Sequence, residues 1–150
     1  MADREFGFET LCLHAGQLAD SATGSRAVAV YQTASYVFDD NDHAASLFNL
    51  QTFGNVYSRM MNPTSAVLEE RLATLEGGRA GVVVGSGMAA QMVALLSLLE
   101  AGDELVSAST LYGGTYSQFD YAFRRMGINT HFVDPDDPQN FAKAITSKTK

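Results

Sequence analysis

The chain has 150 residues, of which 46% are hydrophobic and 18% are charged, and its formal net charge is −7. This length and composition allow a globular fold with a sizeable core. The negative charge would repel a nucleic-acid backbone, so no nucleic acid is expected as a partner. No apolar run has the length of a membrane span or the flanks of a signal peptide, and the single cysteine, Cys12, cannot form an internal disulfide. We therefore expect a cytoplasmic protein without a membrane partner.

The three histidines suggest no metal site. His14, His43 and His131 lie far apart in the sequence, and none has a cysteine or carboxylate at metal-ligand spacing. Each is interpreted as an ordinary surface or packed residue.

The first part of the sequence shows little periodicity. Residues 1–30 mix charged and small residues, which predicts an extended arm rather than a packed element. Residues 28–38 are β-prone and aromatic without clean alternation, so we expect partly buried extended chain. Asp42 is expected to cap a short helix over residues 43–50.

A clearer helix follows, with Asn62 as its predicted cap, Pro63 at its first position and an end at Gly77. In the loop before it, Tyr57 and Arg59 are two residues apart, so in extended chain both would point the same way. A guanidinium and a phenol together suit a phosphate. The alternative is a solvated arginine beside a packed tyrosine.

Residues 82–99 are the most informative stretch. Val82–Val84 predict a buried parallel strand and residues 88–99 a helix, with Gly85 and Gly87 at the junction. Unpaired N–H groups and the positive end of the helix dipole meet there, which suits a phosphate. The alternative is a tight turn that packs helix on strand and binds nothing.

The same glycines also match the dinucleotide pattern G-x-G-x-x-A. That fold requires an acidic residue at the end of the next strand, whereas Asp103 and Glu104 stand at its beginning. A dinucleotide site is therefore not favoured.

The remaining sequence predicts strands at residues 104–109 and 128–133. Between them lie a glycine-bearing turn at residues 111–116 and an aromatic helix that ends at Gly127, and a last helix is expected from Pro138 to about Ser147. Strands that alternate with helices predict a parallel α/β sheet with right-handed crossovers.

Three loops together carry a family resemblance. The sequences YSRMMNPT at 57–64, SGMAA at 86–90 and LYGGTY at 111–116 resemble the Cys/Met-metabolism family of pyridoxal-phosphate-dependent enzymes. The resemblance covers nearly the whole chain. It implies an α/β fold, the N-terminal part of the major domain of the fold type I, aspartate aminotransferase-like transferases. Residues 1–60 would be an arm and subunit-contact segment, and residues 61–150 the first part of the cofactor domain.

The resemblance also implies roles for individual residues. The N–H groups of Gly87 and Met88, with Ser86 on the same turn, would bind the phosphate of pyridoxal 5′-phosphate. Tyr57 and Arg59 would reach the phosphate held by a neighbouring subunit, so the partner would be a second copy of the chain. A homo-oligomer, a dimer of dimers with shared active sites, is the implied assembly.

Tyr112 would stack on the cofactor ring and assist proton transfer near the substrate. Two departures from the family are small: Met88 stands where relatives often carry glutamine, and Ala29 where many carry proline.

Within the family, LHAGQ at 13–17, YQTASYVFDD at 31–40 and LFNLQTFG at 47–54 resemble the members that act on O-acetylhomoserine. The implied reaction replaces the acetate of this small amino-acid substrate with sulfide or a thiol, giving homocysteine or methionine. A methionine or cystathionine γ-lyase, or a γ-synthase, of the same family is the alternative. A non-catalytic fragment that acts only with partner chains is the alternative from another class.

In the family, the lysine that binds the cofactor covalently and the aspartate beside the pyridine nitrogen lie beyond residue 150. Lys143, Lys148 and Lys150 have no matching glycine or hydroxyl context, and none is assigned this role. The sequence is therefore expected to be an N-terminal piece that is inactive alone.

Overall fold

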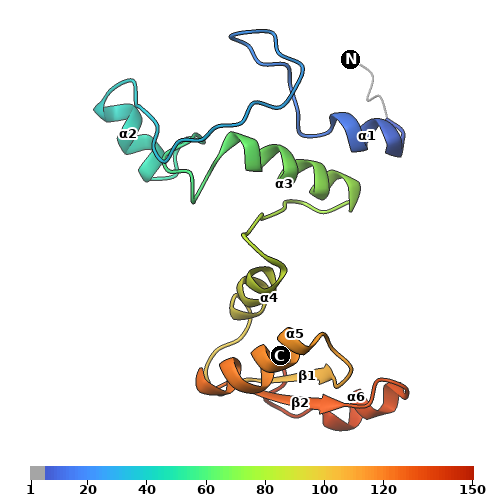
Figure 1. Ribbon diagram of the computed structural model, residues 1–150. Coiled ribbons are helices and arrows are strands. Elements are labelled where there is room, and N and C mark those ends of the chain that lie inside the picture. The colour runs from blue at the N-terminus through green and yellow to red at the C-terminus, as the bar shows by residue number, and fades with distance from the viewer. Residues whose placement is uncertain (1–5) are drawn as a thin grey trace. The chain divides into compact units, whose positions relative to one another are not determined.

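The computed structural model describes residues 6–150, which form two compact units divided between Val83 and Val84. The first unit contains α1 (Phe8–His14), α2 (Asn41–Phe48) and α3 (Pro63–Leu75). The second contains α4 (Gly87–Leu96), β1 (Glu104–Ala108), α5 (Gly113–Ser117), the π-helical turn η1 (Gln118–Phe123), β2 (Asn129–Val133) and α6 (Pro138–Ala144), as Figure 1 shows.

In the first unit, the chain that follows α1 lies along α3. Nε of Arg71 donates a hydrogen bond of 2.9 Å to the carbonyl of Ala15, and Oγ1 of Thr64 donates one of 2.9 Å to the carbonyl of Ala29. Gly16 fits against the helix because a Cβ there would lie 2.7 Å from the carbonyl oxygen of Val67. Residues 15–30 contain no helix or strand, as predicted, although turns interrupt them at residues 15–16 and 21–23.

The N-terminal region differs from expectation in one element, because Phe8–His14 form helix α1. The helix has Glu9 in its first turn and His14 in its last, which suits the helix dipole. A seven-residue helix is too short to be stable alone, and α1 packs against α3. The prediction for residues 1–5 lies outside the described residues.

Helix α2 begins earlier than predicted and has a different cap. Oδ1 of Asp40 accepts a hydrogen bond of 2.7 Å from the backbone N–H of His43, so Asp40 is the cap and Asp42 lies in the first turn. The prediction that Asp42 caps this helix is wrong. Two aspartates at this spacing both satisfy the capping preference, and the observed backbone selects Asp40.

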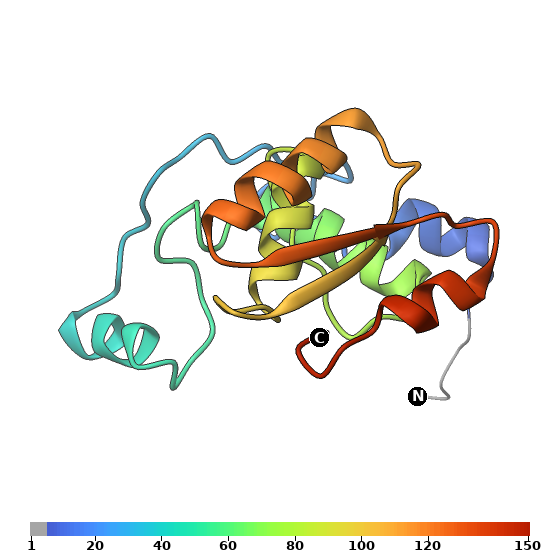
Figure 2. The ribbon, with the colours of Figure 1, turned by 90° about the horizontal axis from the view of Figure 1, so that it is seen from below.

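The α2 segment, residues 37–53, extends away from α1 and α3 (Figure 2). Its only buried side chain among the described residues is Leu47, while Val37, Leu50 and Phe53 are exposed. Residues 28–38 form no strand, and only the bridge between Ser35 and Tyr57 joins them to another part of the chain in strand geometry. Extended chain was correctly predicted here, although most of it is exposed rather than partly buried.

Helix α3 begins and ends as predicted. Oδ1 of Asn62 accepts a hydrogen bond of 2.9 Å from the N–H of Thr64, and Pro63 occupies the first turn. The helix ends at Leu75, and Gly77 follows with φ of 63°, a left-handed conformation that favours glycine.

In the second unit, β1 and β2 are parallel neighbours, with Leu105 opposite Thr130 and Ser107 opposite Phe132. Because side chains alternate along a strand, these four residues share one face of the sheet. The core on that face consists of buried Leu99, Phe119, Phe123 and Ile128, against which Met92, Leu95, Leu105, Leu111 and Phe132 pack. The predicted parallel α/β arrangement is confirmed, with both strands in the predicted places.

Residues 82–84 do not form the predicted strand. In the described residues, the sheet consists of β1 and β2, and Val82 is 76% exposed. The N–H of Val83 instead donates a hydrogen bond of 2.8 Å to the carboxylate of Glu69 on α3. A strand is defined by pairing with a neighbour, so three valines without a neighbouring strand remain irregular extended chain.

The helix between the strands begins earlier than expected. α5 starts at Gly113, inside the predicted turn, and continues through η1 to a left-handed Gly127 with φ of 81°. The last helix is also shorter than predicted. It is capped by Asp137 and ends at Ala144.

Candidate functional site

The turn before α4 presents unpaired donors to open space. Ser86 caps α4, and its Oγ accepts a hydrogen bond of 3.1 Å from the N–H of Ala89. The N–H groups of Gly87 and Met88 bond to no group among residues 6–150. A Cβ on Gly87 would meet no atom within 4 Å. This arrangement can bind an anion, because two donors and the positive end of a ten-residue helix dipole point to the same place.

Tyr112 lies next to this turn. It precedes α5, its side chain is 78% exposed, and its hydroxyl makes no hydrogen bond to any residue of the described chain. The two segments approach each other at Gly114, where a Cβ would lie 2.7 Å from Cε1 of Tyr112 and 3.4 Å from Sδ of Met88. The structure therefore brings together four of the predicted site residues, Ser86, Gly87, Met88 and Tyr112.

Buried polar side chains hold α4 against α5 and η1. Nε2 of Gln118 donates a hydrogen bond of 3.1 Å to the carbonyl oxygen of Met88, and Oγ1 of Thr115 donates one of 3.1 Å to Oε1 of Gln91. Thr115 is 6% exposed and Gln118 is 9% exposed. The sequence interpretation missed these residues. The available signal for them was their spacing of three residues in a helix with aromatic neighbours. This spacing places both side chains on one face of the helix.

Tyr57 and Arg59 form the other group, in the first unit. Cζ of Arg59 lies 5.3 Å from the centroid of the Tyr57 ring, within the range of a cation–π interaction, and both side chains are exposed. The N–H groups of Met60 and Met61 donate to the carbonyl of Tyr57 at 2.8 and 3.0 Å, so the segment is a turn. The expected proximity is present, but it results from a turn and not from alternation along extended chain.

The loop that carries this pair is attached to the start of α3. Nδ2 of Asn62 donates hydrogen bonds of 3.0 Å to the carbonyl of Tyr31 and to Oγ of Ser58, and that Oγ in turn donates to the carbonyl of Thr33. The cap residue of α3 therefore also orients the residue between Tyr57 and Arg59.

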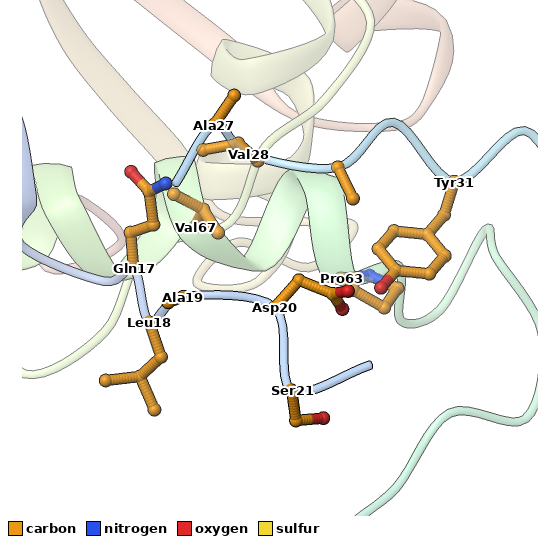
Figure 3. A pocket seen from close by; sticks show the side chains of 11 residues that line it. Gln17, Leu18, Ala19, Asp20, Ser21, Ala27, Val28, Tyr31, Pro63 and Val67 are labelled. Carbon is orange, nitrogen blue, oxygen red and sulfur yellow. The ribbon is translucent and has the colours of Figure 1, made fainter. Parts of the chain in front are cut away.

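A separate cavity of about 320 Å³ lies between the arm and α3 in the first unit (Figure 3). Its lining includes Gln17, Tyr31, Val67 and the carboxylate of Asp20. Thr23 donates to Oδ2 of Asp20 through its hydroxyl at 2.6 Å and through its N–H at 2.8 Å, and these bonds lower the pKa of Asp20. The cavity therefore contains a satisfied carboxylate and no unpaired acid.

Another ionisable cluster joins the sheet to the end of the chain. Oε2 of Glu104 accepts hydrogen bonds from Oγ1 of Thr146 at 2.6 Å and from Nε2 of His131 at 3.0 Å. These two bonds, with the nearby charge of Lys148, lower the pKa of Glu104. Residues 6–150 contain no cluster of three or more histidine, cysteine or acidic side chains that would hold a metal ion. No helix in this range is long and apolar enough to cross a membrane.

Comparison with known proteins identifies the family. The family model for Cys/Met metabolism PLP-dependent enzymes matches residues 9–150. An O-acetyl-L-homoserine sulfhydrylase from Leptospira meyeri is 57% identical over 147 residues, which is 98% of this chain and 33% of that protein. A homocysteine/cysteine synthase from Kluyveromyces lactis is 56% identical over 95% of this chain and 32% of its own length. The chain thus spans about a third of these curated relatives.

Solved structures agree with this result. A Campylobacter jejuni protein assigned as an O-acetylhomoserine (thiol)-lyase, with N′-pyridoxyl-lysine-5′-monophosphate, superposes with a TM-score of 0.92 at 42% identity, over 97% of this chain and 36% of that one. Cystathionine gamma-lyase from Lactobacillus plantarum, complexed with L-serine, gives a TM-score of 0.82 at 33% identity over 97% and 35% of the two chains. The chain belongs to the Cys/Met metabolism family of pyridoxal-phosphate-dependent enzymes.

The residues present fit this cofactor. Its phosphate needs hydrogen-bond donors and positive potential, and the N–H groups of Gly87 and Met88, with the Ser86 hydroxyl, would meet this need. Its flat ring needs an accessible aromatic face, which Tyr112 offers. Lys143, Lys148 and Lys150 are all exposed and stay unassigned.

Proposed function

We propose that this chain forms the phosphate-binding part of an enzyme that exchanges the acetate of O-acetylhomoserine for sulfide, or for a thiol, to form homocysteine or methionine. The single observation that supports it most is the position of two unpaired amides, Gly87 N–H and Met88 N–H, beside the exposed ring of Tyr112. The names of the Leptospira and Kluyveromyces relatives point to the same reaction.

In this proposal, Ser86, Gly87 and Met88 bind the cofactor phosphate, and Tyr112 packs on the cofactor ring and exchanges a proton near the leaving group. The bound cofactor supplies the electron sink that stabilises a substrate carbanion. The protein fixes the position of the phosphate, so that ring and substrate are held in a productive geometry. The unpaired hydroxyl of Tyr112 is free to exchange a proton.

Tyr57 and Arg59 serve the phosphate site of a neighbouring subunit in a homo-oligomer, a dimer of dimers. Residues 1–60 contribute the arm and subunit contacts, and residues 61–150 begin the cofactor domain. The exposed apolar side chains of the α2 segment support this assignment, since Val37, Leu50 and Phe53 would be covered by another chain. The protein acts in the cytoplasm, in agreement with a lone unpaired Cys12.

The test is an assay of the complete protein with pyridoxal phosphate, O-acetylhomoserine and sulfide, in which homocysteine and acetate should appear in equal amounts. Release of ammonia and a 2-oxo acid from methionine or cystathionine, without this exchange, would favour a γ-lyase. No turnover and no visible absorption band after addition of the cofactor would favour a non-catalytic assembly role.

A crystal structure of the complete protein with cofactor tests the phosphate site directly. The amides of Gly87 and Met88 should lie within hydrogen-bond distance of the phosphate. Amides that instead bond to protein groups would contradict the proposed site.

A further inference from the structure

We propose that Gly114 is a positioning residue for the ring of Tyr112. The ring occupies space that a side chain at residue 114 would fill. The inference rests on the proposed role of Tyr112 at the cofactor. Gly114 itself would not touch the cofactor and would act only by positioning the Tyr112 ring. A Cβ at residue 114 would lie 2.7 Å from Cε1 and 3.3 Å from Cδ1 of Tyr112. Two carbons of different residues do not approach to 2.7 Å without repulsion.

Comparison with Gly113 shows why residue 114 must be glycine: the reason is the lack of space for a side chain, and not the backbone conformation. Gly113 and Gly114 both lie in the first turn of α5, and neither has positive φ. A Cβ on Gly113 would meet no atom within 4 Å. Only residue 114 of the two is therefore required to be glycine by its surroundings, and Gly113 is a natural control.

Gly114 also lies beside the phosphate-binding turn. The same Cβ position is 3.4 Å from Sδ of Met88, a residue of the first turn of α4. A side chain at residue 114 would therefore meet the Tyr112 ring on one contact and the Met88 side chain, from the first turn of α4, on another.

A larger side chain at residue 114 would move the ring and not the helices. α4 and α5 are held by the hydrogen bonds from Thr115 to Gln91 and from Gln118 to the carbonyl of Met88, and both donor residues are buried. The Tyr112 ring is 78% exposed and has no hydroxyl partner among the described residues, so it is the group that can rotate. An alanine at residue 114 would therefore displace the ring from its position next to the turn.

The experiment compares Gly114→Ala with Gly113→Ala in the complete protein loaded with pyridoxal phosphate. Gly113→Ala should retain the wild-type circular dichroism in the visible band of the cofactor. Gly114→Ala should change that band and weaken cofactor binding about 2- to 10-fold, the range expected for a lost aromatic contact. If both variants behave like wild type in these measurements, the inference is wrong.

A double-mutant cycle tests whether the effect passes through the ring. In a Tyr112→Ala background, Gly114→Ala should cause no further change in the cofactor dissociation constant or in the visible dichroism, because the ring that it displaces is absent. The same loss in both backgrounds would overturn the inference. If Gly114→Ala fails to fold, the double variant decides: recovered folding supports a clash with Tyr112, and persistent misfolding contradicts it.

These readouts separate the inference from the proposed function. If the wild-type protein does not exchange acetate for sulfide, the proposed reaction is wrong. The dichroism and the cofactor dissociation constants of the two glycine variants still decide the role of Gly114.

Discussion

The side-chain amide of Gln118 donates a hydrogen bond of 3.1 Å to the carbonyl oxygen of Met88. A residue of η1 thus holds the first turn of α4, the turn whose N–H groups face the proposed phosphate. The other polar atom of this side chain, Oε1, is buried without a partner among the described residues. Because one polar atom of Gln118 is bonded and the other is not, substitutions at residue 118 can measure what each atom contributes to stability.

Replacement of Gln118 by glutamate should be more harmful than replacement by methionine. Gln118→Met loses one hydrogen bond but also removes the unpaired oxygen, so we expect a loss of about 1 kcal/mol or less. Gln118→Glu buries a carboxylate against the Met88 carbonyl and should cost about 3 kcal/mol at neutral pH. Urea-induced unfolding of the two variants measures the difference. Equal stability would mean that residue 118 does not face this carbonyl.

The Glu104 cluster predicts a pH-dependent stability contribution. Hydrogen bonds from Thr146 and His131 lower the pKa of Glu104, so its stabilising effect is complete above the ordinary pKa of glutamate and is lost as pH falls through the lower folded value. The stability gap between wild type and Glu104→Gln should therefore be wide at about pH 7 and should narrow below about pH 4. Urea unfolding over this range measures it.

Glu76→Gln is the control for this prediction, because Glu76 is exposed and its carboxylate bonds to no described residue. Its stability gap should be small at every pH. A gap for Glu104→Gln that stays constant down to the acid range would show that the charge of Glu104 contributes nothing.

Asn62 should contribute more to stability than an ordinary helix cap. Its side chain accepts from Thr64 and also donates to Tyr31 and Ser58. A cap alone is worth about 1 kcal/mol, and the two donated bonds should raise the loss in Asn62→Ala to about 2 kcal/mol. Asn62→Asp keeps the acceptor for Thr64 but places a carboxylate oxygen against the carbonyl of Tyr31, so it should recover little of the stability lost in Asn62→Ala in urea unfolding.

The matched control is Asn55→Ala, an exposed asparagine whose side chain makes no hydrogen bond to described residues. It should change stability by less than about 0.5 kcal/mol. A loss as large as that of Asn62→Ala would argue against the specific role of the Asn62 bonds.

Tyr112→Phe should lower kcat of the complete enzyme by roughly 10²-fold while the cofactor dissociation constant stays nearly unchanged, because the ring remains and the hydroxyl is lost. Tyr112→Ala should weaken cofactor binding as well. Tyr121→Phe, which also removes an exposed hydroxyl of the second unit, should keep the wild-type kcat. Wild-type turnover by Tyr112→Phe would exclude proton transfer by this residue.

Arg59 should act on a site in another subunit. An Arg59→Ala protein and a copy inactivated at the cofactor-binding lysine should regain activity when their subunits are exchanged, because some hybrid sites then contain both required groups. Arg79→Ala, which changes an exposed arginine outside the loop, should be active without a partner. If verified exchange restores no activity, Arg59 serves its own chain or has no role.

The sequence determined the elements whose signals are local. Asn62 followed by Pro63 predicted the start of α3, because a side-chain cap and a fixed proline φ act within a few residues. The apolar run after Gly87 likewise predicted α4 over residues 88–99, and the observed helix begins one residue earlier, at Gly87, and ends at Leu96. The two strands of the second unit were predictable because glycines delimit short β-prone runs.

The tertiary structure alone decided the features that depend on neighbours in space. Val82–Val84 are as β-prone as the observed strands, yet they pair with no described strand, and Glu69 accepts the N–H of Val83. α1 forms where a short helix can pack against α3. Gly113 and Gly114 are adjacent glycines, and only their surroundings distinguish them: a Cβ at residue 114 would meet the Tyr112 ring and Sδ of Met88, whereas one at residue 113 would meet no atom within 4 Å. Backbone preference acts through adjacent residues, whereas pairing, packing and steric room are set by atoms far away in the sequence, which only the folded chain brings into contact.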